Sequence, residues 1–413
     1  MKILQIRLES SSRGVKDRIA EADRRLLKKN GHRVTYFEKN IREMNKYSLV
    51  ASSFSGRGTS YGANECSSQM RSLIQKNRPN VVHVYNATSA NFSDIYQNCQ
   101  KLGIAVIQSL HHYELLCPMS AKFYSNKLCK LCVQKSLLKE DGQKKCFRDN
   151  QIQTSDLLKT ITDYWKQKGY QEKIDYYLVP NEFFREKLIS FGLPDKKVLV
   201  KPDFSNNPVS ASGEVEDYLL FIGKLTEDSG IRTLLKACVS LPNVPLRILG
   251  DGPLKQEVSD ACSSSPNLQF LGWQSKEDCL QHLARALLLV FPTESYDVFP
   301  STIIKSYAHG VPVIASNLGG TRHLVSDGDH GCLFPCGDSE VLAEKIDMLL
   351  KNPDLLATMR ERARAEFEEK YTSEKNYQIL INLYQDALSG KKRVKDRRNG
   401  FNRRPSPYSL ILK

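Results

Sequence analysis

The chain lacks the long apolar run that a membrane-spanning helix needs. Nowhere among its 413 residues does a hydrophobic stretch approach the ~20 residues that cross a bilayer. The opening residues 1–8 are typical of a β-strand rather than of a charged leader before a secretory core. We therefore expect a cytoplasmic protein.

The sequence also lacks the short signatures of several large enzyme classes. It has no glycine-rich P-loop, no strand-to-helix serine elbow, no metalloprotease helix and no EF-hand calcium loop. It shows no internal repeat beyond a general alternation of apolar runs and amphipathic stretches. These absences exclude the motif-defined classes and leave the order of strands, helices and turns as the main guide to function.

Cysteine is present, but not in a pattern that indicates disulfides. A cytoplasmic chain uses cysteine mainly as thiols or metal ligands, and seven of the eleven cysteines are scattered. The other four lie within residues 117–146 with a Cys-x-x-Cys at the centre; they are Cys117, Cys129, Cys132 and Cys146. Thiolates at such spacing can surround a tetrahedral ion, which predicts a structural zinc site. The irregular outer spacing fits buried thiols or a redox pair equally well.

Positive charge is concentrated at one end of the chain. Of the net charge of +14, residues 391–413 supply +8, because they hold nine Lys or Arg and one Asp. Such a tail is attracted to anionic lipid at ~1 kcal/mol per basic residue, and a solvated disordered end that binds nothing is an equal alternative. Nucleic acid is the weakest candidate partner, because no aromatic platform or reading motif accompanies the basic residues.

The length and the alternation of elements predict an α/β protein with two similar domains. Strands are expected at residues 2–8, 34–38, 81–85, 104–110 and 174–180, then at 218–223, 246–250, 268–272, 287–291 and 312–315. Helices are expected at 16–30, from 230, from 253, from 276, and at 339–350, 353–370 and 373–388. We predict a first domain at 1–201 with a Cys-rich insertion at 117–146, a linker at 202–216, a second domain at 217–372, a helix at 373–389 and a disordered tail at 390–413.

Residues that follow strands are the first candidates for a site, because doubly wound sheets bind ligands at the carboxyl ends of their strands. Gly223 and Lys224 follow one strand, and a lysine can act as a point charge on phosphate. Gly319 and Gly320 offer backbone N–H groups near a helix start. The same glycines are equally consistent with tight turns alone.

The stretch 294–316 carries the most specific pattern. It runs Glu294-Ser-Tyr-Asp-Val-Phe-Pro-Ser-Thr-Ile-Ile-Lys-Ser-Tyr-Ala-His-Gly-Val-Pro-Val-Ile-Ala-Ser. This resembles the nucleotide-sugar-binding half of the family-four retaining glycosyltransferases, the glycosyl transferases group 1. That family places two glutamates eight residues apart, one at the donor sugar and one at the ribose. Here Asp297 and Lys305 stand at those positions, and Glu294 lies three residues earlier.

The resemblance extends to the residues that would hold the donor diphosphate. Gly223-Lys224-Leu225 and Ser229-Gly230 match the family's glycine-arginine-leucine and lysine-glycine patterns, so Lys224 replaces the arginine and Ser229 the lysine. Lys305, which cannot accept hydrogen bonds from ribose, is hypothesised to supply the phosphate charge lost at Ser229; a lysine that only covers the helix surface is the alternative. His323 stands where the family often has a further glutamate.

Further matches support the same family. The first-half loop Leu110-His111-His112-Tyr113 resembles the loop whose histidine contacts the donor sugar, and the turn Gly14-Val15-Lys16 occupies the family's double-glycine loop, with Val15 in place of the second glycine. The turn 250–254 resembles the one after the second strand of the donor domain. The resemblance also adds Gly250 and Phe299 to the donor-binding set.

The resemblance implies two Rossmann-like doubly wound domains that face each other across a cleft, as in the GT-B fold, with the helix at 373–389 crossing back to the first domain. It implies a hexosyltransferase that moves a sugar from a nucleotide-diphosphate sugar to a hydroxyl of a glycan or glycolipid in cell-surface assembly, without a catalytic metal. It also implies a peripheral location at the inner face of a membrane. His111 and Asp297 would orient the sugar, and Lys224 would stabilise the leaving group. The changes at four positions suggest an alternative, a degenerate glycosyltransferase-like binding or scaffolding subunit; they are Lys224, Ser229, Lys305 and His323.

Overall fold

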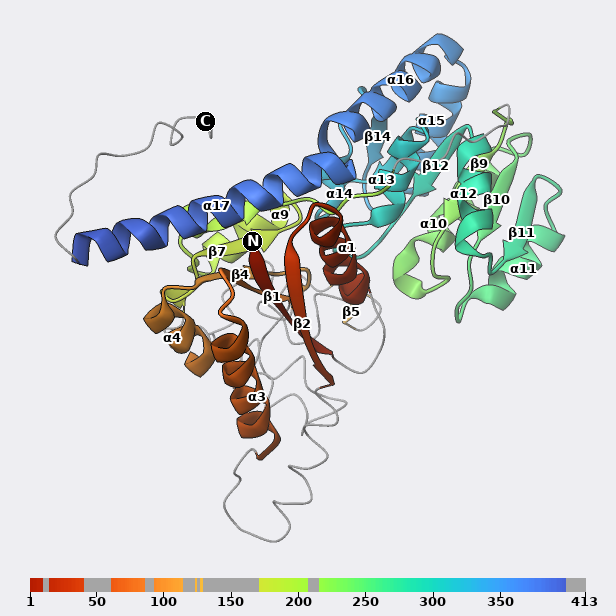
Figure 1. Cartoon of the computed structure of the whole chain (residues 1–413). Coiled ribbons are helices and arrows are strands. Elements are labelled where there is room, and N and C mark those ends of the chain that lie inside the picture. Colours follow the sequence, from red (N-terminus) through yellow and green to blue (C-terminus); the bar gives the residue numbers. More distant parts are fainter. Residues whose placement is uncertain are drawn as a thin grey trace, which may run out of the picture.

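The computed structural model describes residues 1–9, 15–40, 61–85, 93–113, 123–124, 127–128, 171–206 and 215–398. Within these residues the chain forms two six-stranded parallel sheets and one short antiparallel pair, β5 (Phe123–Tyr124) with β6 (Lys127–Leu128). The two large sheets lie in separate halves of the molecule (Figure 1). This confirms the predicted α/β architecture of two doubly wound domains.

The first sheet has the strand order β2-β1-β3-β4-β7-β8. Its strands are β1 (Lys2–Glu9), β2 (Arg33–Asn40), β3 (Val81–Tyr85), β4 (Ala105–Ser109), β7 (Tyr176–Val179) and β8 (Val198–Val200). Every residue of β3 and β4 is buried, as expected for strands covered on both faces. The short β8 was not predicted from the sequence.

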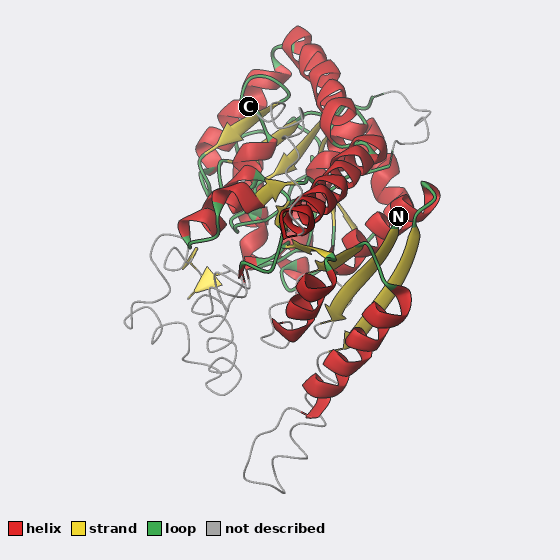
Figure 2. Cartoon of the chain, turned by 60° about the vertical axis from the view of Figure 1, so that its left-hand side comes forward, coloured by secondary structure: helices red, strands yellow, loops and turns green. Residues whose placement is uncertain are grey.

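Helices cover both faces of this sheet, as Figure 2 also shows. They include α1 (Val15–Lys29), α3 (Tyr61–Asn77), α4 (Ser93–Leu102) and α9 (Glu182–Ser190), with a 3-10 turn η3 (Asp195–Lys197) before β8. Alternate side chains of β1 enter different cores. Leu4 and Ile6 pack with Met70 of α3 and Ile95 of α4, whereas Ile3 packs with Leu27 of α1.

The second sheet has the order β11-β10-β9-β12-β13-β14. Its strands are β9 (Leu219–Ile222), β10 (Leu246–Leu249), β11 (Leu268–Gly272), β12 (Leu288–Phe291), β13 (Val313–Ser316) and β14 (Gly331–Phe334). The helical elements are η4 (Glu227–Ser229), α10 (Ile231–Val239), α11 (Lys255–Ser263), α12 (Lys276–Arg285), α13 (Ser301–Ala308), α14 (Thr321–Leu324), α15 (Ser339–Leu350) and α16 (Pro353–Lys370). The edge strand β14 was not predicted from the sequence.

The last helix, α17 (Ser373–Arg398), leaves the second domain and lies along the first (Figure 1). Leu380 and Tyr384 pack in the core that contains Ile3 of β1, and Lys391 Nζ lies 2.8 Å from Asp175 Oδ1. The helix ends later than the expected residue 388, so the tail expected to be disordered from residue 390 is helical as far as Arg398. Lysine and arginine favour helices and are stabilised near the helix C-terminus, and Gly390 does not end the helix.

No helix in the described ranges combines the length and the apolar character that crossing a bilayer requires.

Candidate active site

Backbone packing shapes the strand ends of the second domain. The Gly223 N–H donates to Leu249 O at 3.1 Å, and the Gly250 N–H donates to Gly272 O at 2.8 Å. A Cβ at Gly250 would lie 1.9 Å from Gly223 O, so a side chain there would collide with the neighbouring turn. Lys224 is exposed directly beside this contact. The predicted residues Gly223, Lys224 and Gly250 therefore lie together at the carboxyl edge of the sheet.

The start of α10 is fixed by Gly230. Its φ of +72° suits glycine, and a Cβ there would lie 1.7 Å from Pro292 O, at the end of β12. Ser229 Oγ donates to Thr226 O at 2.7 Å and accepts from the Ile231 N–H at 3.3 Å. The hydroxyl that replaces the expected lysine thus takes part in closing the turn before α10.

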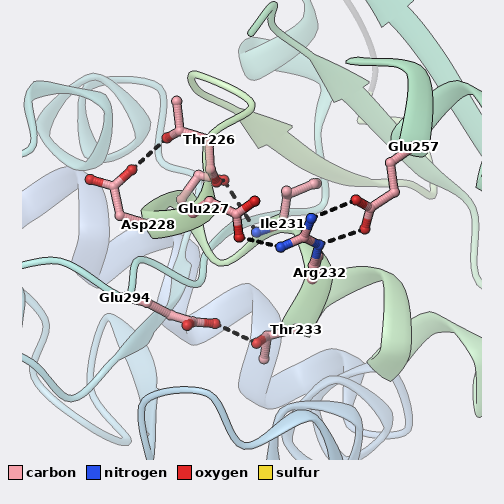
Figure 3. Close-up of polar contacts among 9 residues, drawn as sticks. Thr226, Glu227, Asp228, Ile231, Arg232, Thr233, Glu257 and Glu294 are labelled. Carbon is pink, nitrogen blue, oxygen red and sulfur yellow. Dashed lines mark hydrogen bonds and ion pairs between the residues drawn. The ribbon is translucent and has the colours of Figure 1, made fainter. Parts of the chain in front are cut away.

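Glu294 points toward α10, as Figure 3 shows. Its Oε1 accepts a 2.6 Å hydrogen bond from Thr233 Oγ1, and its N–H donates to Asp228 O at 2.9 Å. These contacts hold Glu294 beside the first turns of α10. The carboxylate therefore adds negative charge to a region where the resembled family places a lysine.

Arg232, in the first turn of α10, is paired with two glutamates. Arg232 makes hydrogen bonds of 2.6 and 2.7 Å to the two oxygens of Glu257 and also pairs with Glu227 (Figure 3). The carboxylate of Glu257, and then that of Glu227, raise the pKa of Arg232. A diphosphate near the start of α10 would consequently need positive partners other than Arg232, among them Lys224 and backbone N–H groups.

The loop that carries Asp297 bridges the two domains. Asp297 Oδ2 accepts a 2.8 Å hydrogen bond from Thr293 Oγ1 within the loop. Asn181, which caps α9 of the first domain by accepting from the Phe184 N–H at 2.9 Å, donates from Nδ2 to Val298 O. The loop next to Asp297 is therefore bonded directly to the first domain.

Aromatic stacking reinforces this contact. The ring of Phe183 on α9 stacks on that of Tyr296, with centroids 5.9 Å apart and planes inclined by 8°. Gly319 lies against the same tyrosine, because a Cβ there would come within 3.0 Å of Tyr296 Cδ1. At Gly320 a Cβ would lie 2.5 Å from Asn181 Nδ2 and 2.6 Å from Val298 O. The predicted glycine pair thus leaves room for the contact between domains.

His111 follows β4 at the carboxyl edge of the first sheet. Its Nε2 lies 3.5 Å from Asp203 Oδ1, and both side chains are buried. Burial, and then the Asp297 carboxylate, raise the pKa of Tyr113, two residues further along. Tyr113 also belongs to the core cluster against which Tyr296 and Val298 pack, so the His111 segment and the Asp297 loop lie close together.

Three other predicted positions have packing contacts in the structure. Lys305 is half-buried on α13. Burial raises the pKa of Cys279 on α12, and the Lys305 ammonium opposes this rise, which indicates that Lys305 lies on the side of α13 that faces α12. The ring of Phe299 lies edge-on to Tyr371, with centroids 6.3 Å apart. The ring centroids of His323 and Phe183 lie 6.2 Å apart. Burial, and then the positive charge of Arg322, lower the pKa of His323.

The remaining predictions fall on parts of the chain that the structure does not describe. Gly14 and the four clustered cysteines lie outside the described residues, and for Val15 and Lys16 only the helical backbone of α1 is described. Among the residues that are described, no group of three or more His, Cys, Asp or Glu is placed to hold a metal ion. The zinc hypothesis therefore stays a prediction.

Sequence reasoning missed Asn181, Asp203 and Thr233. Asn181 had a usable signal, because it follows the predicted strand at 174–180 and precedes a helix, where N-cap residues occur. Asp203 follows β8, which was not predicted. Thr233 lies in a predicted helix, and only the fold brings it to Glu294.

Comparison with known proteins finds relatives of the second domain and structures of the same fold. Residues 204–366 match the family model described as glycosyl transferases group 1. A lipopolysaccharide core biosynthesis glycosyltransferase, LpsE of Rhizobium meliloti, is 27% identical over 42% of this chain and 50% of its own length. The O-antigen chain mannosyltransferase C of Escherichia coli is 30% identical over 43% of this chain and 48% of its own length. The chain thus spans about half the length of these curated relatives.

Solved structures match over nearly the whole chain. HepE from Anabaena, crystallised in complex with UDP, has a TM-score of 0.64 at 15% identity and covers 94% of this chain and 100% of its own. The apo form of the lipopolysaccharide outer core galactosyltransferase WaaB has a TM-score of 0.63 at 13% identity and covers 95% and 100%. At these identities the likeness concerns the fold, which is the two-domain GT-B fold.

Proposed function

We propose that this chain, a group 1 glycosyltransferase by its family match and a GT-B protein by its fold, transfers a sugar with retention from a nucleotide-diphosphate sugar to a hydroxyl group. The observation that carries the proposal is the contact between the Asp297 loop and the first domain. Asn181 Nδ2 donates a hydrogen bond to Val298 O, and Tyr296 and Val298 pack against the core cluster of the first domain that contains Tyr113. Candidate sugar-orienting residues of both domains thereby face one region.

The proposed chemistry is positioning and electrostatic stabilisation. His111 and Asp297 orient the donor sugar, so that the acceptor hydroxyl meets the anomeric carbon in a productive geometry. The exposed Lys224 and the backbone N–H groups around Gly319 and Gly320 stabilise the charge that develops on the leaving diphosphate. This mechanism requires no metal cofactor.

The acceptor we propose is a glycan or glycolipid. The names of the two curated relatives refer to lipopolysaccharide core and O-antigen chains, which favours cell-surface polysaccharide or glycolipid assembly. Acceptors of this class are presented at membranes, and the +8 charge of residues 391–413 would draw the protein to an anionic lipid surface. We accordingly propose a cytoplasmic protein that works peripherally at the inner membrane face.

A panel of UDP-, GDP- and ADP-sugars tests this proposal by calorimetry and by donor hydrolysis, with the wild type and Lys305→Glu measured side by side. The wild type should bind one nucleotide sugar selectively and hydrolyse it slowly in the absence of acceptor. Absence of binding by the wild type, or binding that appears only in Lys305→Glu, would contradict the proposal and would support the degenerate-subunit alternative.

A further inference from the structure

His111 and Asp203 form a buried pair at the junction of the two domains. Nε2 of the imidazole lies 3.5 Å from Oδ1 of the carboxylate, and the side chains are 7% and 11% exposed. Oδ1 receives no hydrogen bond from the described residues, so the contact is electrostatic. The two residues follow different strands of the first sheet, β4 and β8. A buried carboxylate is costly unless a positive group or a hydrogen-bond donor compensates it, so this pairing has an energetic reason.

The buried charged groups Lys201 and Asp23 pair with each other. Lys201 Nζ lies 3.1 Å from Asp23 Oδ1, with side-chain exposures of 3% and 1%, and Asp23 Oδ2 also accepts a 2.9 Å hydrogen bond from the Tyr85 hydroxyl. Lys201 thus balances Asp23 rather than Asp203. In the described part of the chain, the side chain found facing the Asp203 carboxylate is that of His111.

A second buried histidine does not take over this role. His83 bonds through Nδ1 to the Tyr384 hydroxyl and through Nε2 to the Ser109 hydroxyl, both at 2.7 Å. Burial, and then the charges of Lys201 and His111, hold the pKa of His83 well below its usual range, so its ring is neutral at physiological pH. His111 remains the imidazole that faces Asp203.

The backbone around Asp203 is held on both sides. Before it, the Lys201 N–H donates to Val179 O at 2.7 Å, and Asn376 Nδ2 of α17 donates to Pro202 O at 2.6 Å. After it, the Ser205 N–H donates to Tyr371 O at 3.1 Å. Contacts from β7, from α17 and from the end of α16 therefore fix the path of the chain at Asp203.

We propose that Asp203 is a positioning residue whose buried carboxylate, facing Nε2 of His111, stabilises the proton on that nitrogen and so fixes the tautomer and the orientation of the imidazole toward the donor sugar. A fixed negative charge beside one nitrogen selects the tautomer as well as the ring plane, as second partners of functional histidines commonly do. The inference rests on the function proposed above for His111. It adds to that site a residue that the sequence pattern does not identify.

The first test observes the ring directly by ¹⁵N NMR of protein labelled at its eight histidines, with His111→Gln identifying the signals of His111. In the wild type Nε2 should carry the proton, and in Asp203→Ala the proton should redistribute toward Nδ1. Asp195→Asn is the matched control, because Asp195 is an exposed aspartate of the same domain, and it should leave the signals unchanged. If Asp203→Ala does not fold, Asp203→Asn replaces it, with a smaller change of the same sign.

Unchanged His111 signals in a folded Asp203 variant would overturn the proposal. The NMR signals report the protonation of the His111 ring and do not depend on enzymatic turnover. The test therefore remains valid even if the protein turns over no donor, so failure of this inference can be told apart from failure of the proposed function. With an active enzyme, Asp203→Ala should lower kcat by up to about 100-fold with little change in KM for the donor. The double variant with His111→Ala should then be no slower than His111→Ala alone, whereas additive losses would contradict the coupling.

Discussion

Single residues decide how much positive charge is available at the proposed diphosphate site. Ser229 stands where the resembled family has a lysine, and its hydroxyl donates a hydrogen bond to Thr226 O in the turn before α10. Arg232 is neutralised by two carboxylates, and Glu294 adds a further negative charge next to Thr233. Lys224 and Lys305 are then the cations that the sequence pattern offers to the diphosphate. Whether Lys305 compensates for Ser229 can be tested by exchanging the two charges.

We predict that Lys305→Glu alone weakens binding of the preferred nucleotide sugar by about tenfold, the effect of losing a charge-assisted contact of roughly 1.4 kcal/mol. Adding Ser229→Lys should restore the affinity, because it returns a cation to the start of α10. Calorimetry measures both, with Lys276→Glu on the exposed surface of α12 as the control. A double variant that binds no better than Lys305→Glu would rule out the compensation.

His83 gives the stability a definite pH dependence. Its pKa is lowered in the folded state, so below about pH 6.5 the unfolded chain takes up a proton that the folded protein resists. The contribution of His83 to the free energy of unfolding is therefore complete above about pH 6.5 and is lost as the pH falls below it, at up to about 1.4 kcal/mol per pH unit. Denaturant unfolding between pH 7.5 and 5.0 should show a shallower pH dependence for His83→Gln than for the wild type. The less buried His282 gives the control His282→Gln, which should flatten the slope less; equal slopes for His83→Gln and the wild type would refute the assignment.

At the scale of elements, the success of the sequence analysis followed the strength of the local pattern. The apolar run at 268–272 and the helices at 339–350 and 353–370 were predicted with the boundaries that the structure has. The strands β8 and β14 were missed, because each is only three or four residues long and is held in place by its neighbour in the sheet. The end of α17 was placed too early, because the basic residues that follow were interpreted as a disordered tail, whereas the helix continues to Arg398.

Gly230 is the element boundary with the strictest requirement. We predict that Gly230→Ala destabilises the protein by at least about 2 kcal/mol more than Gly272→Ala. Both glycines have a positive φ, but a Cβ at Gly230 collides with Pro292 O whereas a Cβ at Gly272 meets nothing within 4 Å. Denaturant unfolding of the two variants isolates the collision from the backbone strain that they share. Equal losses would show that the junction between α10 and β12 relaxes freely.

At the scale of the whole molecule, the site is assembled by contacts between distant parts of the chain. Gly320 lies against Asp297 O and Val298 O in the structure, as loops at the carboxyl ends of parallel strands tend to converge. Motif order did not identify Asn181 or Asp203, whose partners Val298 and His111 are 117 and 92 residues away. Such pairs are specified by tertiary packing, which no local pattern in a single sequence records.

The charge asymmetry of the chain predicts a separate membrane function for the tail. Removing residues 392–413, which lie beyond the Lys391–Asp175 ion pair, should abolish sedimentation with vesicles rich in anionic lipid and leave thermal unfolding nearly unchanged. Neutral vesicles provide the control. Retention of the truncated protein on anionic vesicles would assign the attraction to the folded domains, and retention of the intact protein on RNA but not on lipid would assign the tail to nucleic acid.

The most direct test of the account follows, by proton NMR, the anomeric configuration of the sugar released from the preferred nucleotide-diphosphate donor or transferred to an acceptor. A retaining glycosyltransferase with a working site should first yield the anomer that the donor carries. An inverted product would contradict the proposed mechanism, and complete absence of turnover with a donor that binds would contradict the proposed activity.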